Sequence, residues 1–419
     1  MSLVFELIRK ILARRSPGQA QDQSVLQAFE AALVSDPDNP ALMFEAARSY
    51  AAAGRRAEAI GHCRAALRLQ PAFPGASMML ALLLRQSLNV DEAILVLQQA
   101  RAATPSDPEV LTQLRQLLGN GRVPMWHFSM MNDELRNHAY QQAILATVRS
   151  GDHVLEIGTG SGLLAMMSAR AGASHVNTCE MVAPVADKAR QIIEQNGYAA
   201  KVTVISKEST ALQIPQDLAE PADVLIAEVI SSDLLGEGML DSYDDARARL
   251  LRPGARILPC GAAVMAQLAG SDKLAPYLRV GEIAGFDLGG FNDFTPVSLC
   301  PQEFGVSLEK YSTPFEVFRF DFQSDQPITP ERKAITVGVT TSGLCYGVLQ
   351  WIRLDLAPGV RFENAPDDAE GSNRAGHWRQ LLYTFSQPLQ VQHGQQLQLV
   401  AAHDRNSMMF YCAGWSSQH

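Results

Sequence analysis

The stretch His153 to Glu180, HVLEIGTGSGLLAMMSARAGASHVNTCE, decides the fold in the middle of this chain. A short apolar run, Val154 to Ile157, ends at alternating glycines, and helix-forming residues follow from Leu163 to Ala171, with Gly172 just after them. This order predicts a βαβ unit. Glycine supplies the positive φ angles and the close backbone approach that a tight strand-to-helix turn needs when a ligand lies across it.

The glycine spacing indicates the kind of ligand. A dinucleotide fingerprint requires G-x-G-x-x-G with a pyrophosphate on the helix N-terminus. Here Gly158, Gly160 and Gly162 alternate and follow the acidic Glu156. Glu180 ends the next predicted strand, where a carboxylate can accept both ribose hydroxyl hydrogens. The pattern favours a nucleoside without phosphates and resembles a loop that binds S-adenosylmethionine, with an ordinary tight turn as the alternative.

Composition gives a soluble globular chain with room for two or three domains, because it has 419 residues of which 47% are hydrophobic. Its six cysteines show no C-x-x-C pair, which predicts a reducing compartment with no disulfide, structural zinc or other metal. The start, MSLVFELIRKILARR, is too short and too charged for a signal peptide or membrane span. We interpret it as an amphipathic helix that caps the next domain, and contact with an acidic membrane surface is the alternative. We expect no membrane protein and a cytoplasmic location, and the nucleus stays open.

Charge is unevenly distributed along the chain. Residues 1 to 120 carry 12 Lys and Arg against 11 Asp and Glu, whereas residues 121 to 419 carry 23 against 33. An acidic C-terminal part makes nucleic acid an unfavourable ligand and attracts cationic substrates.

Residues 24 to 118 repeat with a period of 34, which is the length of a tetratricopeptide helix-turn-helix. The equivalent positions are Pro40, Pro74 and Pro108; Pro37, Pro71 and Pro105; Ala32, Ala66 and Ala100; and Ala59 with Ala93. We expect complete repeats at 40–73 and 74–107, half a repeat at 24–35 and a capping helix at 108–118, with prolines closing each second helix. The resemblance implies a concave surface for a protein partner, and packing against the rest of the chain is the alternative.

The fold prediction is multidomain: helical repeats over 1–120, a Rossmann-like α/β domain over 121–259, and an all-β, barrel-like domain over 260–419. Gly119 to Gly121 mark the first boundary. A buried strand over 224–227 ends at Glu228, and Glu237 follows nine residues later in a glycine-flanked loop. Ligands of open α/β sheets bind at the carboxyl ends of strands, so both glutamates are candidate functional residues.

Short runs with alternating polarity dominate after Arg256, as in FEVFRFDF and GVLQWIRLDL, and they predict half-buried strands. Residues 271–301 contain the glycine-rich, apolar stretch GFDLGGFNDF, which we interpret as a projecting arm. A polar loop over 364–374 precedes His377 and Trp378.

Over residues 121 to 419 the chain resembles the protein arginine N-methyltransferases, and within that family the subgroup with tandem modules and tetratricopeptide repeats. Four motifs in a fixed order carry the resemblance: WHFSMMNDELRN, VLEIGTGSGLLA, EVISSDLLGEG and GHWRQ. It implies an S-adenosylmethionine-dependent enzyme that methylates arginine in protein substrates. It also implies a homodimer through the arm at 271–301, because only one catalytic module is present.

The resemblance assigns residues to two sides of the site. On the cofactor side, Arg136 would bind the carboxylate, Glu180 the ribose, and Glu208 and Ser209 the adenine. The remaining cofactor-side residues are His127, Glu156, Gly158, Gly160 and Gly162.

On the substrate side, Glu228 and Glu237 would grip the guanidinium group. His377 and Trp378 match the family's T-H-W loop with Gly376 in place of threonine, and His377 is expected to pair with Asp133. The alternatives without a catalytic role are that His377 and Trp378 are ordinary core residues and that Asp133 forms a surface salt bridge with Arg136.

The chemistry fits these residues. Guanidinium is planar and presents a fork of donors, so two carboxylates can fix it and aim one nitrogen at a methyl group. Either Glu237 or the pair of His377 and Asp133 would accept the released proton. Met130 and Met239 occupy positions that in the family influence the product, and the choice between mono-, symmetric and asymmetric dimethylarginine stays open.

One further departure from the family pattern and two rival functions remain beside this interpretation. The family's Y-F-x-x-Y stretch is replaced by Trp126, His127 and Phe128, so the cofactor lid differs. The rivals are a methyltransferase for small guanidino compounds or its own arginines, and a repeat scaffold with an inactive module.

Overall fold

The computed structural model describes residues 23–73, 75–119, 123–366 and 376–416. The chain divides into two compact units, Met1–Pro124 and Met125–His419, so the α/β and β-rich parts predicted as separate domains lie in one unit. Within the described residues, no helix has the length and apolarity needed to cross a membrane. The predicted N-terminal helix, the glycine boundary after Gly119 and most of the polar loop at 364–374 fall outside the described residues.

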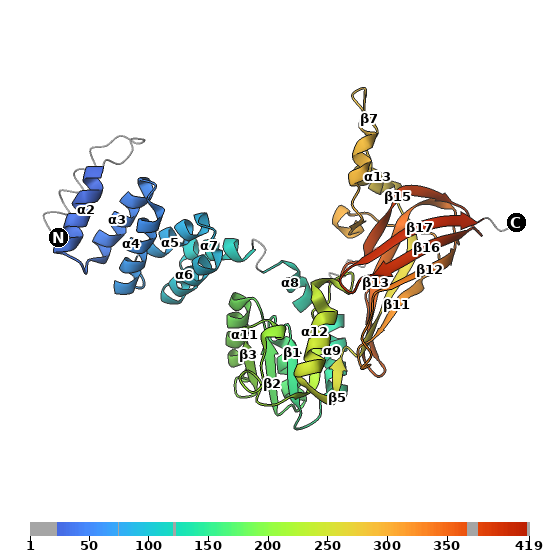
Figure 1. Cartoon of the computed structure of the whole chain (residues 1–419), viewed down its shortest axis with the longest axis horizontal. Helices are drawn as coiled ribbons and strands as arrows, with labels where there is room; N and C mark the ends of the chain where they lie inside the picture. Colours follow the sequence, from blue (N-terminus) through green and yellow to red (C-terminus); the bar gives the residue numbers. More distant parts are fainter. Residues whose placement is uncertain (1–22, 74, 120–122, 367–375, 417–419) are drawn as a thin grey trace. The chain divides into compact units, whose positions relative to one another are not determined.

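The described part of the first unit consists of helices and the turns between them (Figure 1). Its helices are α2 (Gln23–Ser35), α3 (Pro40–Ala52), α4 (Arg56–Leu69), α5 (Ala76–Gln86), α6 (Val90–Ala103) and α7 (Pro108–Gly119). These are the predicted half repeat, two helix pairs and capping helix. The small residues predicted at close helix contacts are buried, namely Ala32, Ala59, Ala66, Ala93 and Ala100.

The prediction that prolines close each second helix is confirmed for Pro37, Pro71 and Pro105, whereas Pro40 and Pro108 begin the next helix. Pro40 and Pro108 are the first residues of α3 and α7, where a missing N–H costs no helical hydrogen bond. Pro37, Pro71 and Pro105 instead follow the ends of α2, α4 and α6. Helix α3 is also capped by Asn39, whose Oδ1 accepts the Leu42 N–H at 3.1 Å.

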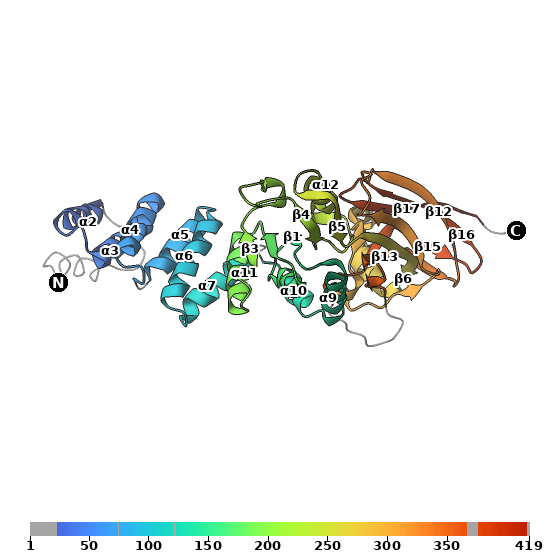
Figure 2. The same cartoon turned by 90° about the horizontal axis from the view of Figure 1, so that it is seen from below.

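The second unit begins with α8 (Trp126–Met131) and α9 (Glu134–Thr147) and continues into an α/β sheet. Its strands are β1 (His153–Ile157), β2 (His175–Cys179), β3 (Val202–Ile205), β4 (Ala222–Ala227) and β5 (Leu251–Leu258), all parallel, in the order β3-β2-β1-β4-β5. The connecting helices are α10 (Leu163–Ala171), α11 (Ala183–Gln195), η1 (Ser209–Ala211), η2 (Gly236–Gly238) and α12 (Met239–Arg249). Figure 2 shows α9 and α10 on one face of the sheet and α12 on the other, which is a doubly wound arrangement and agrees with the predicted Rossmann-like domain.

Strand register brings three predicted residues together. Ile157 of β1 lies opposite Cys179 of β2 and Ala227 of β4. Gly158, Glu180 and Glu228 therefore leave the sheet at the same edge.

The described residues of the β-rich part form two larger antiparallel sheets and a two-stranded one, β7 (Glu282–Ile283) with β8 (Phe286–Asp287), in the arm. The seven-stranded sheet has β6 (Gly261–Gly270), β9 (Ser298–Leu299), β10 (Glu309–Lys310), β11 (Phe315–Asp321), β13 (Gly343–Ala357), β14 (Val360–Glu363) and β15 (Leu381–Val391). The three-stranded sheet has β12 (Glu331–Gly338), β16 (Gln396–His403) and β17 (Met408–Ser416). The predicted alternation is present in β11, whereas β6 and the middle of β13 are buried on both faces and β13 is 15 residues long. Closure into a barrel is not confirmed. One hydrophobic core includes both the parallel sheet and the β-rich strands, for example Val154 and Tyr383.

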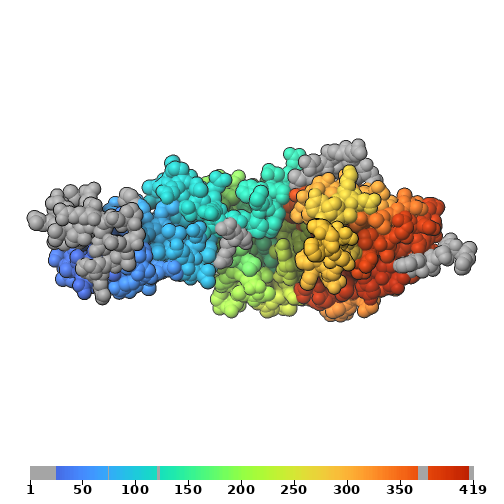
Figure 3. Space-filling model, turned by 90° about the horizontal axis from the view of Figure 1, so that it is seen from above, coloured from blue at the N-terminus to red at the C-terminus, as the bar shows by residue number. Residues whose placement is uncertain are grey.

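The arm projects from the β-rich part in Figure 1 and is seen end-on in Figure 3. It consists of η3 (Asp272–Leu274), α13 (Ala275–Leu278), β7 (Glu282–Ile283), β8 (Phe286–Asp287) and η4 (Gly289–Phe294), and η5 (Pro301–Phe304) follows β9. Large apolar side chains are exposed along it: Tyr277, Ile283, Phe286, Leu288, Phe291, Phe294 and Val297.

Candidate active site

Helix α9 carries a buried arginine at its first turn. Asp133 caps the helix by accepting the backbone N–H of Arg136 at 3.0 Å. The Arg136 side chain is 3% exposed and its guanidinium lies over the Tyr140 ring, 4.7 Å from the centroid. Its Nη1 donates to Asn137 Oδ1 at 2.8 Å. Both Arg136 Nε and the Tyr140 hydroxyl are buried without a hydrogen-bond partner among the described residues, so donors remain for a ligand.

Glu228, directly after β4, joins the two parts of the unit. Its Oε2 lies 3.2 Å from Arg136 Nη2, and its Oε1 lies 3.3 Å from His377 Nε2. Burial alone raises the pKa of Glu228, but Arg136 and His377 outweigh that effect and hold the pKa below its ordinary value. Glu228 is therefore ionised at neutral pH.

The predicted pairing of His377 with Asp133 is wrong. His377 faces Glu228, and its Nδ1 has no hydrogen-bond partner among the described residues. The Asp133 carboxylate is used by the α9 cap. Its Oδ2 lies only 3.6 Å from where a Cβ on Gly376 would stand, so the missing side chain of Gly376 leaves the space beside Asp133 open.

Glu237 faces the same cavity as Glu228, and its own backbone is strained. Its φ of 72° falls in the left-handed region, which a non-glycine residue adopts only at a cost of order 1–3 kcal/mol. Asp233 holds the loop by accepting the Gly236 N–H at 3.0 Å. Burial first, then the charges of Glu228 and Asp233, raise the pKa of Glu237. Glu228 and Glu237 thus differ in electrostatics although both are carboxylates.

The loop that carries the glutamates is attached to the β-rich part by two hydrogen bonds. Trp378 Nε1 donates to the Ile230 carbonyl at 2.6 Å, and the Arg379 N–H donates to Ser232 Oγ at 2.9 Å. Trp378 is buried, so the structure gives it a positioning contact with the loop.

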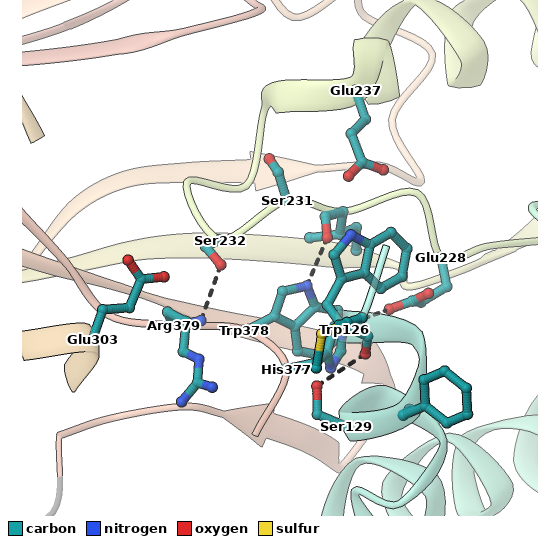
Figure 4. A pocket seen from close by; sticks show the side chains of 13 residues that line it. Trp126, Ser129, Glu228, Ser231, Ser232, Glu237, Glu303, His377, Trp378 and Arg379 are labelled. Atoms are coloured by element: carbon teal, nitrogen blue, oxygen red, sulfur yellow. Dashed lines mark hydrogen bonds and ion pairs between the residues drawn. The ribbon is translucent and has the colours of Figure 1, made fainter. Parts of the chain in front are cut away.

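Glu228, Glu237, His377 and Trp378 line a cavity of about 590 Å³, which is within the usual range for small-molecule sites (Figure 4). Its lining comprises Met125, Trp126, Phe128, Ser129, Glu228, Ile230, Ser231, Ser232, Glu237, Glu303, His377, Trp378 and Arg379. Sequence reasoning did not assign Glu303 or Arg379 to the site. Arg379 belongs to the GHWRQ motif, so the sequence contained a pattern that could have identified it. No local pattern marks Glu303.

The cofactor-side residues lie around the glycine loop. Gly158, Gly160 and Gly162 all have positive φ, at 88°, 51° and 81°. An added Cβ on Gly162 would stand 2.8 Å from Ile193 Cδ1, so both backbone angle and space require glycine there. Glu180 accepts the N–H groups of Gly160 at 3.1 Å and Val182 at 2.9 Å.

The other cofactor-side candidates are placed differently. Glu156 is buried inside β1 and its Oε2 accepts the Thr178 hydroxyl at 2.5 Å, with a pKa that burial raises to about 8. Ser209 is buried and Glu208 is exposed, at the start of η1. The His127 ring stacks on Trp126 with 3.9 Å between centroids. Among the described residues no group of three or more His, Cys, Asp or Glu side chains is arranged to hold a metal ion.

A parallel sheet whose first strand ends in a positive-φ glycine loop, with an acidic residue after the second, is typical of Rossmann-like domains that bind a nucleoside cofactor. Family models agree: residues 139–258 match "Ribosomal protein L11 methyltransferase (PrmA)", and residues 26–75 and 44–108 match "Tetratricopeptide repeat". The buried donors of Arg136 and the Glu180 carboxylate fit the charged and ribose ends of S-adenosylmethionine, which is the cofactor of this enzyme.

Two named relatives and two solved structures are similar over longer spans. The "Arginine N(omega)-methyltransferase" of Streptomyces achromogenes subsp. streptozoticus is 32% identical over 326 residues, covering 78% of this chain and 88% of that protein. "Protein arginine N-methyltransferase 7" of Oryza sativa subsp. indica is 30% identical over 321 residues, covering 68% of this chain and 44% of that protein. The chain thus spans less than half of the latter.

The fold is shared with the Trypanosoma brucei PRMT1 enzyme-prozyme heterotetrameric complex with AdoHcy, at a TM-score of 0.58 and 20% identity over 66% of this chain and 86% of that one. It is also shared with Arabidopsis thaliana protein arginine methyltransferase 10, at a TM-score of 0.54 and 23% identity over 68% and 97%. The chain belongs to the arginine N-methyltransferase family, as its motifs predicted.

Proposed function

We propose that this enzyme transfers a methyl group from S-adenosylmethionine to a guanidino nitrogen of arginine in protein substrates, which the helical repeats recruit. The observation that carries the proposal is the convergence of Glu228 and Glu237 on one cavity, with Arg136 and His377 fixing the first glutamate.

The two glutamates have separate roles. Glu228 keeps its charge because Arg136 and His377 lower its pKa, so it binds the guanidinium as a fixed carboxylate. Each of its oxygens retains a lone pair beyond the contacts to Arg136 and His377. Glu237 has a raised pKa, so it is the better proton acceptor and takes the proton that the methylated nitrogen releases.

Bound S-adenosylmethionine supplies an electrophilic methyl group. Arg136 would bind its carboxylate through the unpaired Nε, Glu180 its ribose, and the glycine loop would pass under the nucleoside. Tight positioning in the cavity, rather than covalent chemistry by the protein, supplies most of the rate enhancement. We include Glu156 as a residue that orients the loop through Thr178.

The test is methyl transfer from labelled S-adenosylmethionine to an arginine-rich protein and to its Arg→Lys counterpart, with mass spectrometry of the product. We expect label on arginine only, and its loss in Glu228→Gln. Mass spectrometry also distinguishes mono-, symmetric and asymmetric dimethylarginine. Cofactor binding without labelled arginine would refute the proposal and favour the scaffold.

We also propose that the enzyme is a homodimer through the arm. The exposed apolar residues along 277–297 support this, because such a patch on a projecting segment is covered in a stable assembly. Phe286→Asp with Phe294→Asp is expected to shift the gel-filtration mass from two chains to one. A single-chain mass for the unchanged protein under active conditions contradicts the dimer.

We place the partner of the repeats on the surface of the helix pairs α3 with α4 and α5 with α6, and a bait screen with residues 1–120 identifies it. The six cysteines, none in a disulfide, support a cytoplasmic location.

A further inference from the structure

The cavity contains a second pair of charged side chains besides the two catalytic glutamates. Arg379 and Glu303 both line it and have opposite charges. Neither side chain forms a hydrogen bond or ion pair with any residue in the described ranges, and they do not pair with each other. Figure 4 places this pair apart from Glu228 and Glu237 along the cavity.

The backbone that carries the pair is held in place. The Arg379 N–H donates to Ser232 Oγ at 2.9 Å, which ties it to the glutamate loop. Gln302, next to Glu303, hydrogen-bonds to Gln380, next to Arg379. The segments that carry Arg379 and Glu303 are thus held close together, yet the two side chains do not pair with each other. Both charges therefore remain available to a ligand with complementary charges.

Arginine carries a charged α-ammonium and a charged α-carboxylate, which complement Glu303 and Arg379, only when it is a free amino acid. Its α-ammonium needs a carboxylate, and its α-carboxylate is bound best by a guanidinium fork. In a protein both groups are neutral amides and need neither partner. A cavity of about 590 Å³ has room for a whole amino acid.

We infer that this enzyme also methylates free arginine, with Glu303 binding the α-ammonium and Arg379 the α-carboxylate while Glu228 and Glu237 hold the guanidinium. The inference rests on the proposed function, since the reaction is the same. The guanidino nitrogen forms the new N–C bond with its electron pair, the donor S–C bond breaks with its pair left on sulfur, and the proton goes to Glu237.

The experiment compares kcat/KM for L-arginine, agmatine and Nα-acetyl-L-arginine in the full-length enzyme. Agmatine lacks the carboxylate and Nα-acetyl-L-arginine lacks the ammonium. Because a hydrogen-bonded charge contributes about ten- to hundredfold, we expect L-arginine to exceed each analogue by that factor. Arg379→Gln should bring the ratio of L-arginine to agmatine close to one, and Glu303→Gln should do the same for L-arginine to Nα-acetyl-L-arginine.

Each result decides the inference. Equal rates for the three compounds in the unchanged enzyme, or variants that lower all three equally, would overturn it. A labelled arginine-rich protein run in parallel separates the two claims. Label on protein but none on L-arginine overturns only this inference, label on L-arginine but none on protein overturns only the protein substrate, and label on neither overturns both.

Discussion

The ion pair between Arg136 and Glu228 makes a quantitative prediction. Both side chains are buried, at 3% and 9% exposed, and their charged atoms are 3.2 Å apart. Arg136→Met would leave a buried carboxylate with His377 as its remaining partner. Removing one partner of such a pair costs about 3–5 kcal/mol. We expect the free energy of unfolding to fall by that amount.

The measurement is urea unfolding at neutral pH followed by tryptophan fluorescence. All four tryptophans, at positions 126, 351, 378 and 415, belong to the second unit, so the helical repeats do not contribute to the signal. The double variant Arg136→Met with Glu228→Gln removes the uncompensated charge. Its loss should be smaller than the sum of the single losses by about 1 kcal/mol or more.

A matched control is Arg361→Met, because Arg361 Nε contacts Asp355 Oδ1 at 2.7 Å while the arginine is 65% exposed. An exposed pair contributes about 0–1 kcal/mol. A loss in Arg136→Met no larger than that in Arg361→Met, or strictly additive losses in the double variant, would refute the reasoning.

Three further measurements probe the same site. Trp378→Phe leaves the Ile230 carbonyl without its donor and should lower the free energy of unfolding by about 1–3 kcal/mol and also lower kcat, and unchanged values of both would contradict the positioning contact. The raised pKa of Glu237 predicts that kcat/KM for arginine falls with decreasing pH at a point above 4.5, whereas a profile flat down to pH 4.5 would be inconsistent with it. Glu156 has a folded-state pKa of about 8 against 4.5, so the native state binds more protons between these values and the free energy of unfolding falls as pH rises through that window. Glu156→Gln should therefore match the parent near pH 4.5 and exceed it by up to about 5 kcal/mol at pH 8, and equal pH dependence in urea unfolding would count against this.

Residues whose position follows from local geometry were predictable. Gly158, Glu180 and Glu228 each end a parallel strand, and such ends meet at one edge of the sheet whatever lies between them in the sequence. The helical repeats were predictable from their 34-residue period, because units that share a sequence pattern pack in the same way.

Contacts between distant segments were not predictable in the same way. His377 pairs with Glu228 rather than Asp133, and that choice depends on how the loop after residue 375 meets the end of β4. Neither period nor spacing encodes such a contact. The same holds for Glu303, which reaches the cavity from η5, and for the number of strands that pair in each antiparallel sheet.

Glu228 is a point at which the α/β and β-rich parts of the unit meet. Arg136 approaches it from α9 and His377 from the loop before β15, so both segments contribute to the lowered pKa of Glu228. Trp378 adds a second tie by donating to the carbonyl of Ile230 in the glutamate loop. Neither part contains the whole of the proposed guanidinium site, because the α/β part supplies the carboxylates and the β-rich part fixes one of them. Preorganisation of the cavity therefore depends on the hydrophobic core that the parallel sheet shares with the β-rich strands.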